Sequence, residues 1–301
     1  MEVVYLSETR ELDTRESVKV VTSNNFITAK GLEKLSIKAK KLLYVAVAQC
    51  KKNDDEFYEY KIKVSEFAEL MGIDESNVYR EALDITGELA SCKLTYLPKG
   101  GKRFKHIPVT SICEYDEKNC LRVELNKRMT DFLLQLKGSF SQPLLNDFMK
   151  MRSPYSMAIW HLMQREMHSN KPGTKRIEFY LSLEELREVT GTQDKLKQLG
   201  EFKKRVLDKA IREIKDNCSV DITYTNKKKS RTVIGFDFVA ISEYGIDLTD
   251  WEKEHPLKAE RIKKKARKLE LSQKEREGNI TNAEFDELQK LILELDQMSF
   301  A

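Results

Sequence analysis

Residues 201–217 read EFKKRVLDKAIREIKDN, and the chain continues through VDITYT (220–225), NKKKSR (226–231) and TVIGFDFVAI (232–241). The periodicity of the first segment predicts an amphipathic helix, and the alternation in the later segments predicts two strands joined by a polar turn. A short helix is expected upstream, at 184–190. A short helix, a longer helix and a β-hairpin in this order are the winged helix-turn-helix arrangement.

The same order of elements occurs earlier in the chain. An alternating segment leads into a short helix at 65–71 that ends at Gly72, as the later one ends at Gly191. A longer helix is expected at 76–91, and two strands within 92–109 flank the turn PKGGKR. The apolar positions of the two copies coincide: Tyr60, Ile62, Val64, Phe67 and Leu70 match Phe179, Leu181, Leu183, Leu186 and Val189. The sequence therefore predicts an α+β protein with two tandem winged-helix domains related by internal duplication.

These elements divide the chain into predicted domains. Residues 1–23 are polar without a clear period and are expected to form a flexible arm. The first winged-helix domain is assigned to 24–140 and the second to 141–246, and apolar-periodic residues near 125–136 are expected to help join them. Residues 247–301 are predicted to be a helical extension that begins basic and ends in an acidic amphipathic helix.

The charge of the whole chain barely favours an anionic partner, because 53 Lys and Arg face 49 Asp and Glu. The distribution of the cations is more informative. On a helical wheel of about 100° per residue, the apolar side chains of 201–217 share one face and cations gather on the other: Lys204, Arg205, Lys209 and Arg212. Lys203 falls toward the apolar side and is expected to splay at the helix start, and it is predicted to bind DNA together with these cations. The hairpin turn adds further cations: Lys227, Lys228, Lys229 and Arg231.

These cations suit duplex DNA, because lysine and arginine pair with phosphate oxygens and arginine also pairs bidentately with the guanine edge in the major groove. We therefore predict that the helix face around Arg205 and Arg212 reads DNA and that the hairpin turn contacts phosphates. The alternative interpretation is a solvated charged surface without a partner, which is the usual role of a charge run.

The matching parts of the first domain differ in charge. Its longer helix is predicted to expose Arg80 among acidic side chains: Glu81, Asp84 and Glu88. We expect this helix to face protein or to supply one DNA contact through Arg80. The first hairpin keeps cations for which backbone contact is predicted: Lys99, Lys102, Arg103 and Lys105. The basic cluster at 261–268 is interpreted as a phosphate anchor, a helix surface or neither, and the final helix is expected to be docked rather than to bind a partner.

No motif for catalysis or cofactor binding is found. The only Gly-Lys pair, Gly101-Lys102, lacks the upstream glycine and the following hydroxyl residue of a phosphate-binding loop. The histidines include no His-x-His pair that could hold a metal in a nicking enzyme, and the cysteines include no Cys-x-x-Cys pair. No enzyme activity, metal or cofactor is therefore expected. The chain has no secretory signal pattern and no apolar run long enough to span a bilayer, so we expect a cytoplasmic protein without a membrane partner.

Several segments resemble the plasmid replication initiator (Rep) family, whose members carry two winged-helix domains. The similar segments are NNFITAKGLEKLSIKAKKLLYVAVAQC (24–50), MRSPYSMAIWHLM (151–163), IEFYLSLEELREVTG (177–191) and the helix, basic turn and strand within 201–241. The resemblance implies a bacterial, plasmid-associated, non-enzymatic protein that binds iterons, the direct repeats of an origin. It further implies opening of an adjacent AT-rich segment, recruitment of the host initiator and replicative helicase, and repression of its own gene.

The resemblance also assigns parts of the chain. The family's iteron-reading helix falls on 203–212, and its first domain supplies a dimer interface and secondary DNA contacts, so a homodimer in equilibrium with a monomer is expected. It offers no role for the extension from Asp247. The residues alone leave two other functions open: a winged-helix transcription regulator without a replication role, and, less in keeping with the missing motifs, a nicking enzyme.

Overall fold

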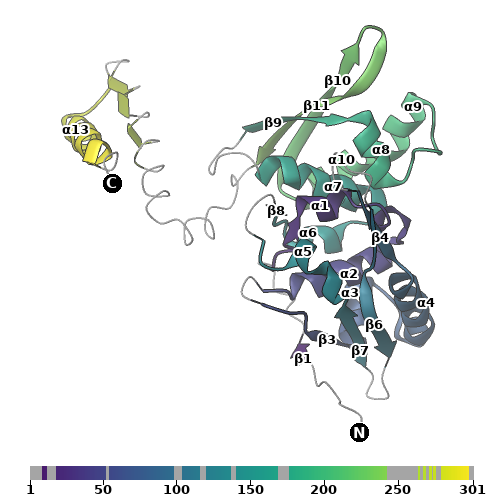
Figure 1. Cartoon of the computed structure of the whole chain (residues 1–301). Helices are drawn as coiled ribbons and strands as arrows, with labels where there is room; N and C mark the ends of the chain where they lie inside the picture. Colours follow the sequence, from purple (N-terminus) through teal and green to yellow (C-terminus); the bar gives the residue numbers. More distant parts are fainter. Residues whose placement is uncertain are drawn as a thin grey trace. The chain divides into compact units, whose positions relative to one another are not determined.

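The computed structural model describes residues 9–11, 18–51, 54–97, 104–115, 120–136, 140–168, 176–242, 264, 267–268, 271–272, 274–275 and 279–297 (Figure 1). The chain divides into two compact units, Met1–Gly245 and Ile246–Ala301. Apart from Ile246, both predicted winged-helix domains fall in the first unit, and the predicted extension falls in the second. The limits of the individual domains stay a prediction.

The second winged-helix region follows the predicted order. Its elements are β9 (Arg176–Ser182), α8 (Leu183–Thr190), α9 (Leu199–Phe202), η4 (Lys203–Leu207), α10 (Asp208–Asn217), β10 (Val220–Lys229) and β11 (Thr232–Ser242). The segments α9, η4 and α10 run on as one helix, with a π-helical turn at η4. Strand β11 lies between β10 and β9 and is antiparallel to both. In Figure 1 this sheet projects at the top of the first unit, beside α9.

Local sequence explains the start and end of α8. The Ser182 side chain accepts a hydrogen bond from the backbone N–H of Glu185 and so caps the helix N-terminus. Gly191 ends the helix with a φ of 63°, in the left-handed region that glycine adopts without strain. Gly72, with a φ of 62°, ends the first short helix in the same way. The predicted equivalence of the two helix ends is confirmed.

The first winged-helix region begins as predicted and then departs from prediction. Its elements are α2 (Ile37–Ala48), β3 (Glu59–Lys63), α3 (Val64–Met71), η2 (Glu75–Asn77), α4 (Val78–Ala90), β4 (Lys93–Tyr96), β5 (Lys105–Pro108), β6 (Thr110–Tyr115) and β7 (Cys120–Leu125). Strands β4 and β5 form the expected hairpin, but as a separate two-stranded sheet. The larger sheet has the order β1-β3-β7-β6, where β1 is Thr9–Glu11.

This topology corrects the comparison between the two hairpins. Strand β7 pairs with β3 as β11 pairs with β9, so β6–β7 occupies the sheet position of β10–β11, and β4–β5 is an additional hairpin. The sequence did not predict β6, because its apolar Ile112 and Tyr115 are exposed and give no buried alternation. Leu125 belongs to β7, so the helical connection expected at 125–136 begins later than predicted.

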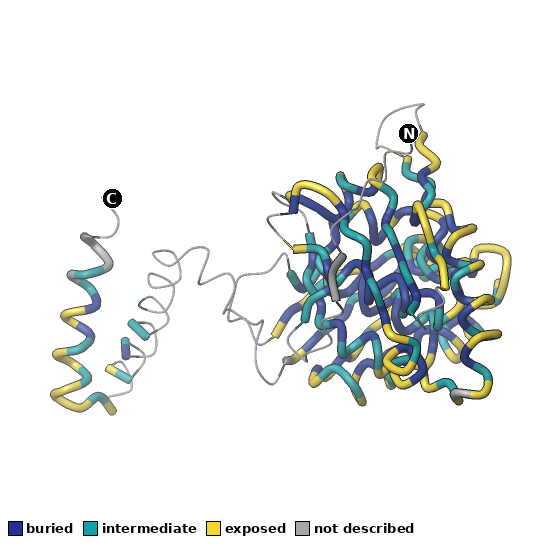
Figure 2. The backbone as a smooth tube through the Cα atoms, turned by 90° about the horizontal axis from the view of Figure 1, so that it is seen from below, coloured by how far each residue is buried: buried dark blue, intermediate teal, exposed yellow. Residues whose placement is uncertain are grey.

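The segments that precede α2 and those that connect β7 to β9 form the centre of the first unit (Figure 1). They are α1 (Asn24–Thr28), η1 (Leu32–Lys34), η3 (Lys127–Met129), α5 (Thr130–Leu133), β8 (Phe140–Ser141), α6 (Leu145–Lys150) and α7 (Pro154–His168). The end of the expected arm is also part of the fold, because β2 (Thr22–Ser23) pairs with β8 and Val20 is fully buried. Figure 2 shows the buried backbone collected inside this body and the exposed residues along its outer loops.

His161 of α7 bonds to strand β2 and to helix α2 of the first region. One ring nitrogen, Nε2, is 2.8 Å from Thr22 Oγ1, and the other, Nδ1, is 2.9 Å from Tyr44 Oη. Burial lowers the pKa of His161 to about 3, so the ring is neutral at physiological pH. His161 is therefore a buried packing residue.

Candidate nucleic-acid interface

The long helix of the second region, α9–η4–α10, has one buried and one exposed face. Its buried apolar side chains are those that the wheel predicted: Phe202, Val206, Leu207, Ala210, Ile211 and Ile214. They hold the helix against the body of the unit, where α10 packs on α7. The opposite side exposes the predicted cations, which we call the cationic face: Lys204, Arg205, Lys209 and Arg212.

The charges of the cationic face are largely uncompensated. Arg205 Nε lies 2.7 Å from Glu201 Oε2, one turn away on the same helix. Both side chains are well exposed, and an exposed pair of this kind contributes only about 0.3–0.5 kcal/mol, so Glu201 orients Arg205 without withdrawing it from a stronger ligand. Among the described residues, Lys204, Lys209 and Arg212 form no ion pair. This surface can therefore accept a polyanion.

Lys203 points sideways, toward the hairpin. Its ammonium nitrogen lies 5.1 Å from the centre of the Tyr224 ring and 3.3 Å from Asn226 Oδ1. The hydroxyl of Tyr224 donates to Asp208 Oδ1 at 2.5 Å, and partial burial together with this bond raises the pKa of Tyr224. The predicted splaying of Lys203 at a helix start is wrong, because the helix already begins at Leu199. These contacts fix the hairpin relative to the long helix.

The hairpin carries its cations differently from the prediction. Lys227, Lys228 and Lys229 belong to strand β10 rather than to a turn, with a bulge between the first two. Lys229 pairs with Thr232, so the loop is reduced to Ser230 and Arg231, and Ser230 has a φ of 57°. The strand was missed because an exposed polar strand has no apolar alternation.

The hairpin cations are all exposed, and only one of them is paired within the described residues: Lys227 Nζ lies 3.2 Å from Asp237 Oδ2. Lys228, Lys229 and Arg231 remain available to a ligand. A cationic strand-loop element beside a cationic helix is a suitable surface for the phosphates that flank a groove.

Arg187 of α8 holds the turn between the two helices of this motif. Its guanidinium donates to the carbonyl oxygens of four residues, at 2.9 to 3.2 Å: Thr192, Lys195, Leu196 and Lys197. It also lies 4.7 Å from the centre of the Phe202 ring, at the base of the long helix. Sequence reasoning missed this residue, because an arginine in a short charged helix carries no sign of bonds to backbone carbonyls. Arg187 therefore positions the long helix.

The long helix of the first region, α4, does not expose a comparable surface. Glu81 accepts from Lys38 Nζ at 2.7 Å, which lowers the pKa of Glu81, and Glu88 accepts from the backbone N–H of Ser36 at the start of α2. Arg80 donates to Asn77 Oδ1 at 3.0 Å and stays exposed. The predicted acidic character is present, but much of it serves to hold α2.

A basic hollow lies beside the first hairpin. It has a volume of about 500 Å³ and is lined by Lys105, His106, Ile107, Lys127, Arg128, Thr130 and Asp131. Lys105 Nζ is 4.0 Å from Asp131 Oδ2, whereas Lys127 and Arg128 form no ion pair with described residues. The Asn126-Lys-Arg sequence after β7 was the signal that could have found them. Lys99, Lys102 and Arg103, predicted to contact DNA, lie outside the described residues.

In the described part of the chain, no group of His, Cys, Asp and Glu side chains is arranged to hold a metal ion. The same residues include no helix with the length and apolar character needed to cross a membrane.

The fold and this surface define a protein with two winged-helix regions, of which the second presents a cationic helix and hairpin. Two family descriptions match the chain: "Initiator Replication protein, WH1" over residues 19–164 and "Initiator Rep protein, WH2" over residues 182–239. Together these ranges cover more than half of the sequence. The chain therefore belongs to the initiator replication protein family, the plasmid replication initiators that its sequence resembles, and the predicted pair of winged helices is confirmed.

A solved structure is similar to this chain over most of the length of both proteins. It is described as "Crystal structure of Pi initiator protein in complex with iteron DNA". The TM-score is 0.65 with 21% sequence identity, and the match covers 76% of this chain and 99% of that one. The similarity supports the fold.

Proposed function

We propose that this initiator binds directly repeated duplex sites, or iterons, in its plasmid origin, and that the cationic face enters the major groove. The observation that carries this proposal is the separation of the long helix into a fully buried apolar face and an exposed one bearing Lys204, Arg205, Lys209 and Arg212. An α-helix fits the major groove, and arginine pairs with guanine there. The iteron complex of the Pi initiator protein, which shares the fold, supports the same class of ligand.

The hairpin β10–β11 and the first region supply contacts to the DNA backbone in this proposal. Lys227, Lys228, Lys229 and Arg231 bind phosphates flanking the groove that the helix enters. The basic hollow adds Lys105, Lys127 and Arg128 in the first region, and Lys99, Lys102, Arg103 and Arg80 remain proposed contacts from sequence. Phosphate contacts fix the protein on the duplex and add affinity for any sequence.

The free protein is proposed to be a homodimer in equilibrium with a monomer, through the first region. Among the described strands, β6 lies at an edge of its sheet, and an edge strand offers backbone groups to another strand. Large apolar side chains are exposed beside it: Tyr79 (65%) and Leu83 (62%) on α4, and Ile112 (47%) on β6 itself. Leu83→Lys with Ile112→Lys is expected to shift the sedimenting species to monomer. Ile241→Lys, at an exposed site on β11, is the control, and an unchanged dimer in the double variant would overturn this interface.

Binding to the repeats is proposed to open an adjacent AT-rich segment and to recruit the host initiator and replicative helicase, without catalysis by this chain. Occupancy of repeats near its own promoter would also repress its gene. A transcription regulator would use the same contacts, so DNA binding alone does not separate the two functions.

The test is a footprint on DNA upstream of the gene at stated salt, followed by permanganate probing for unpaired thymines. We expect protection of direct repeats and protein-dependent opening beside them. Protection of a lone inverted repeat without opening would favour the transcription regulator. Metal-dependent nicking of supercoiled plasmid would instead establish an enzyme.

A further inference from the structure

The described residues of the second unit form two helical segments that pack together around a small core. Helix α13 (Asn282–Gln297) packs against a segment that is helical at its described positions between Lys264 and Glu275. Leu271 is fully buried against Leu288 and Leu291, with Ile280 and Ile292 packed around them. The final helix is therefore docked, as predicted, and its partner is the basic segment of the extension.

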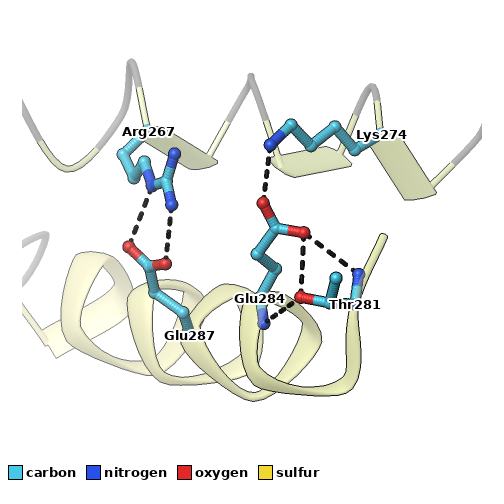
Figure 3. Close-up of polar contacts among 5 residues, drawn as sticks. All are labelled: Arg267, Lys274, Thr281, Glu284 and Glu287. Carbon is cyan, nitrogen blue, oxygen red and sulfur yellow. Dashed lines mark hydrogen bonds and ion pairs between the residues drawn. The ribbon is translucent and has the colours of Figure 1, made fainter. Parts of the chain in front are cut away.

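Ion pairs connect these two helical segments (Figure 3). Arg267 binds Glu287 bidentately, through Nε–Oε1 and Nη2–Oε2 distances of 2.9 Å each. Lys274 Nζ lies 2.6 Å from Glu284 Oε1. Lys264 Nζ lies 3.0 Å from Glu294 Oε2. The basic segment and α13 run antiparallel, because the partners lie progressively earlier in α13 from Lys264 to Lys274.

Glu284 has a second role at the start of α13. Its other carboxylate oxygen accepts from the backbone N–H and the hydroxyl of Thr281, while the backbone N–H of Glu284 donates to Thr281 Oγ1. This is a capping box, which fixes where α13 begins. The bond from Lys274, followed by those from Thr281, lowers the pKa of Glu284 to about 2, so the carboxylate is charged at any physiological pH.

We propose that the basic segment of the extension is a latent binding site for the phosphate backbone of nucleic acid, and that α13 covers it. Carboxylates bind here in the manner of phosphate oxygens, bidentately on an arginine and singly on lysines. The sequence around the paired cations, RIKKKARK at 261–268, is densely basic. The inference extends the proposed function, because the DNA that the second region binds is also the ligand of this site.

The contacts that hold α13 on the basic segment are weak enough for DNA to compete with them. The side chains of Arg267 and Glu287 are 37% and 43% exposed, and ion pairs as exposed as this one contribute little to stability. The apolar contact that opposes opening comes from a few leucine and isoleucine side chains. Duplex DNA presents one charge per about 1.7 Å and releases counterions when cations bind it, which favours exchange at low salt. The extension then adds affinity that does not depend on sequence.

The test compares neighbouring carboxylates of α13 in the full chain. Glu287→Gln removes the bidentate carboxylate that binds Arg267, whereas Asp286→Asn removes the same charge from an exposed side chain that forms no ion pair with described residues. Binding is measured on random-sequence duplex without origin repeats, across a salt series. We expect Glu287→Gln to bind severalfold more tightly than Asp286→Asn and to show the steeper salt slope, because the Arg267 guanidinium becomes more available to phosphates.

A charge-swapped variant separates pairing from unfolding of the two segments. Arg267→Glu with Glu287→Arg keeps the net charge and restores an ion pair, so it should return the affinity toward that of the unaltered chain. Equal affinities for Glu287→Gln and Asp286→Asn would overturn the proposal, because only the overall charge would then matter. Because the duplex lacks repeats, failure here leaves binding to the repeats to be judged by the footprint, and failure of the footprint does not alter this result.

Discussion

The long helices of the two winged-helix regions occupy corresponding places in the fold but use their polar faces differently. In the second region, the cationic face of α9–η4–α10 is exposed, and three of its cations, Lys204, Lys209 and Arg212, have no ion-pair partner among the described residues. In the first region, Glu81 and Glu88 of α4 bind Lys38 and the backbone of Ser36. One copy of the motif is therefore free for a ligand, and the other is engaged in holding its own domain.

Two regions with the same fold therefore need not share a binding surface. Both helices bury an apolar face at the same period, since packing requires it. Nothing in packing constrains the outer face, so its charges are available for DNA in one copy and for intramolecular bonds in the other. If the two faces differ in function as they do in chemistry, substitutions in the two regions should have unequal effects on DNA binding.

The largest effect is expected from the cationic face. Arg205→Ala and Arg212→Ala should each weaken binding to the repeats by about 1–3 kcal/mol, because each removes a base contact. The matched change in the first region, Arg80→Ala, should cost much less. Affinities are measured by fluorescence anisotropy at fixed salt. If Arg80→Ala costs as much as Arg212→Ala, the asymmetry between the regions is wrong.

The stability of the first unit should fall in acid because His161 is buried. The pKa of His161 is about 3 in the fold and 6.5 without burial, so the unfolded chain binds more protons as pH falls below 6.5. Stability is therefore lost on acidification, by about 2 kcal/mol between pH 7 and pH 5 from this group. Urea unfolding at both pH values measures the loss, and His161→Gln should show a correspondingly smaller difference. An equal pH effect in that variant would assign the loss to other groups.

An effect on stability of similar size, with a clear effect on binding, is expected at Arg187. Arg187→Lys keeps the charge but loses the fork that bonds several carbonyls, so the turn before α9 should loosen. We expect about 1–3 kcal/mol lower stability and weaker binding to the repeats. Arg176→Lys, at an exposed site on β9, is the control for the same substitution. Full affinity for the repeats in Arg187→Lys would remove its positioning role.

The smallest effects should come from single phosphate contacts, and they should be alike in both regions. Lys228→Ala in the second region and Lys127→Ala in the first should weaken binding to all sequences equally and reduce the salt slope by about 1. Lys63→Ala, which removes a lysine already paired with Glu66, should change the slope little. A slope unchanged by Lys127→Ala would remove the basic hollow from the interface.

Much of this arrangement could be predicted from the sequence, because packing against a core requires apolar residues at regular spacing. The buried side chains of the long helix, from Phe202 to Ile214, lie where the wheel placed them. Features that lack this regular spacing of apolar residues were missed. Strand β6 exposes its Ile112, Lys227 to Lys229 extend a polar strand, and Arg187 acts through carbonyl groups that every residue possesses.

The basic extension is another region whose contacts the sequence could not predict. Its cluster of cations was consistent with a phosphate anchor or with a plain helix surface. The structure pairs Lys264, Arg267 and Lys274 with carboxylates of α13, a choice that depends on which helix docks and in which register. Local charge counts cannot supply that information.

The claim that the cationic face of the second region reads base pairs can be tested by a loss-of-contact measurement. The unaltered chain and Arg212→Ala are titrated against a set of duplexes in which each base pair of one repeat is changed in turn. We predict that the unaltered chain discriminates at every contacted position and that Arg212→Ala loses discrimination at one guanine while keeping it elsewhere. Full discrimination by Arg212→Ala and by Arg205→Ala at all positions would contradict the claim.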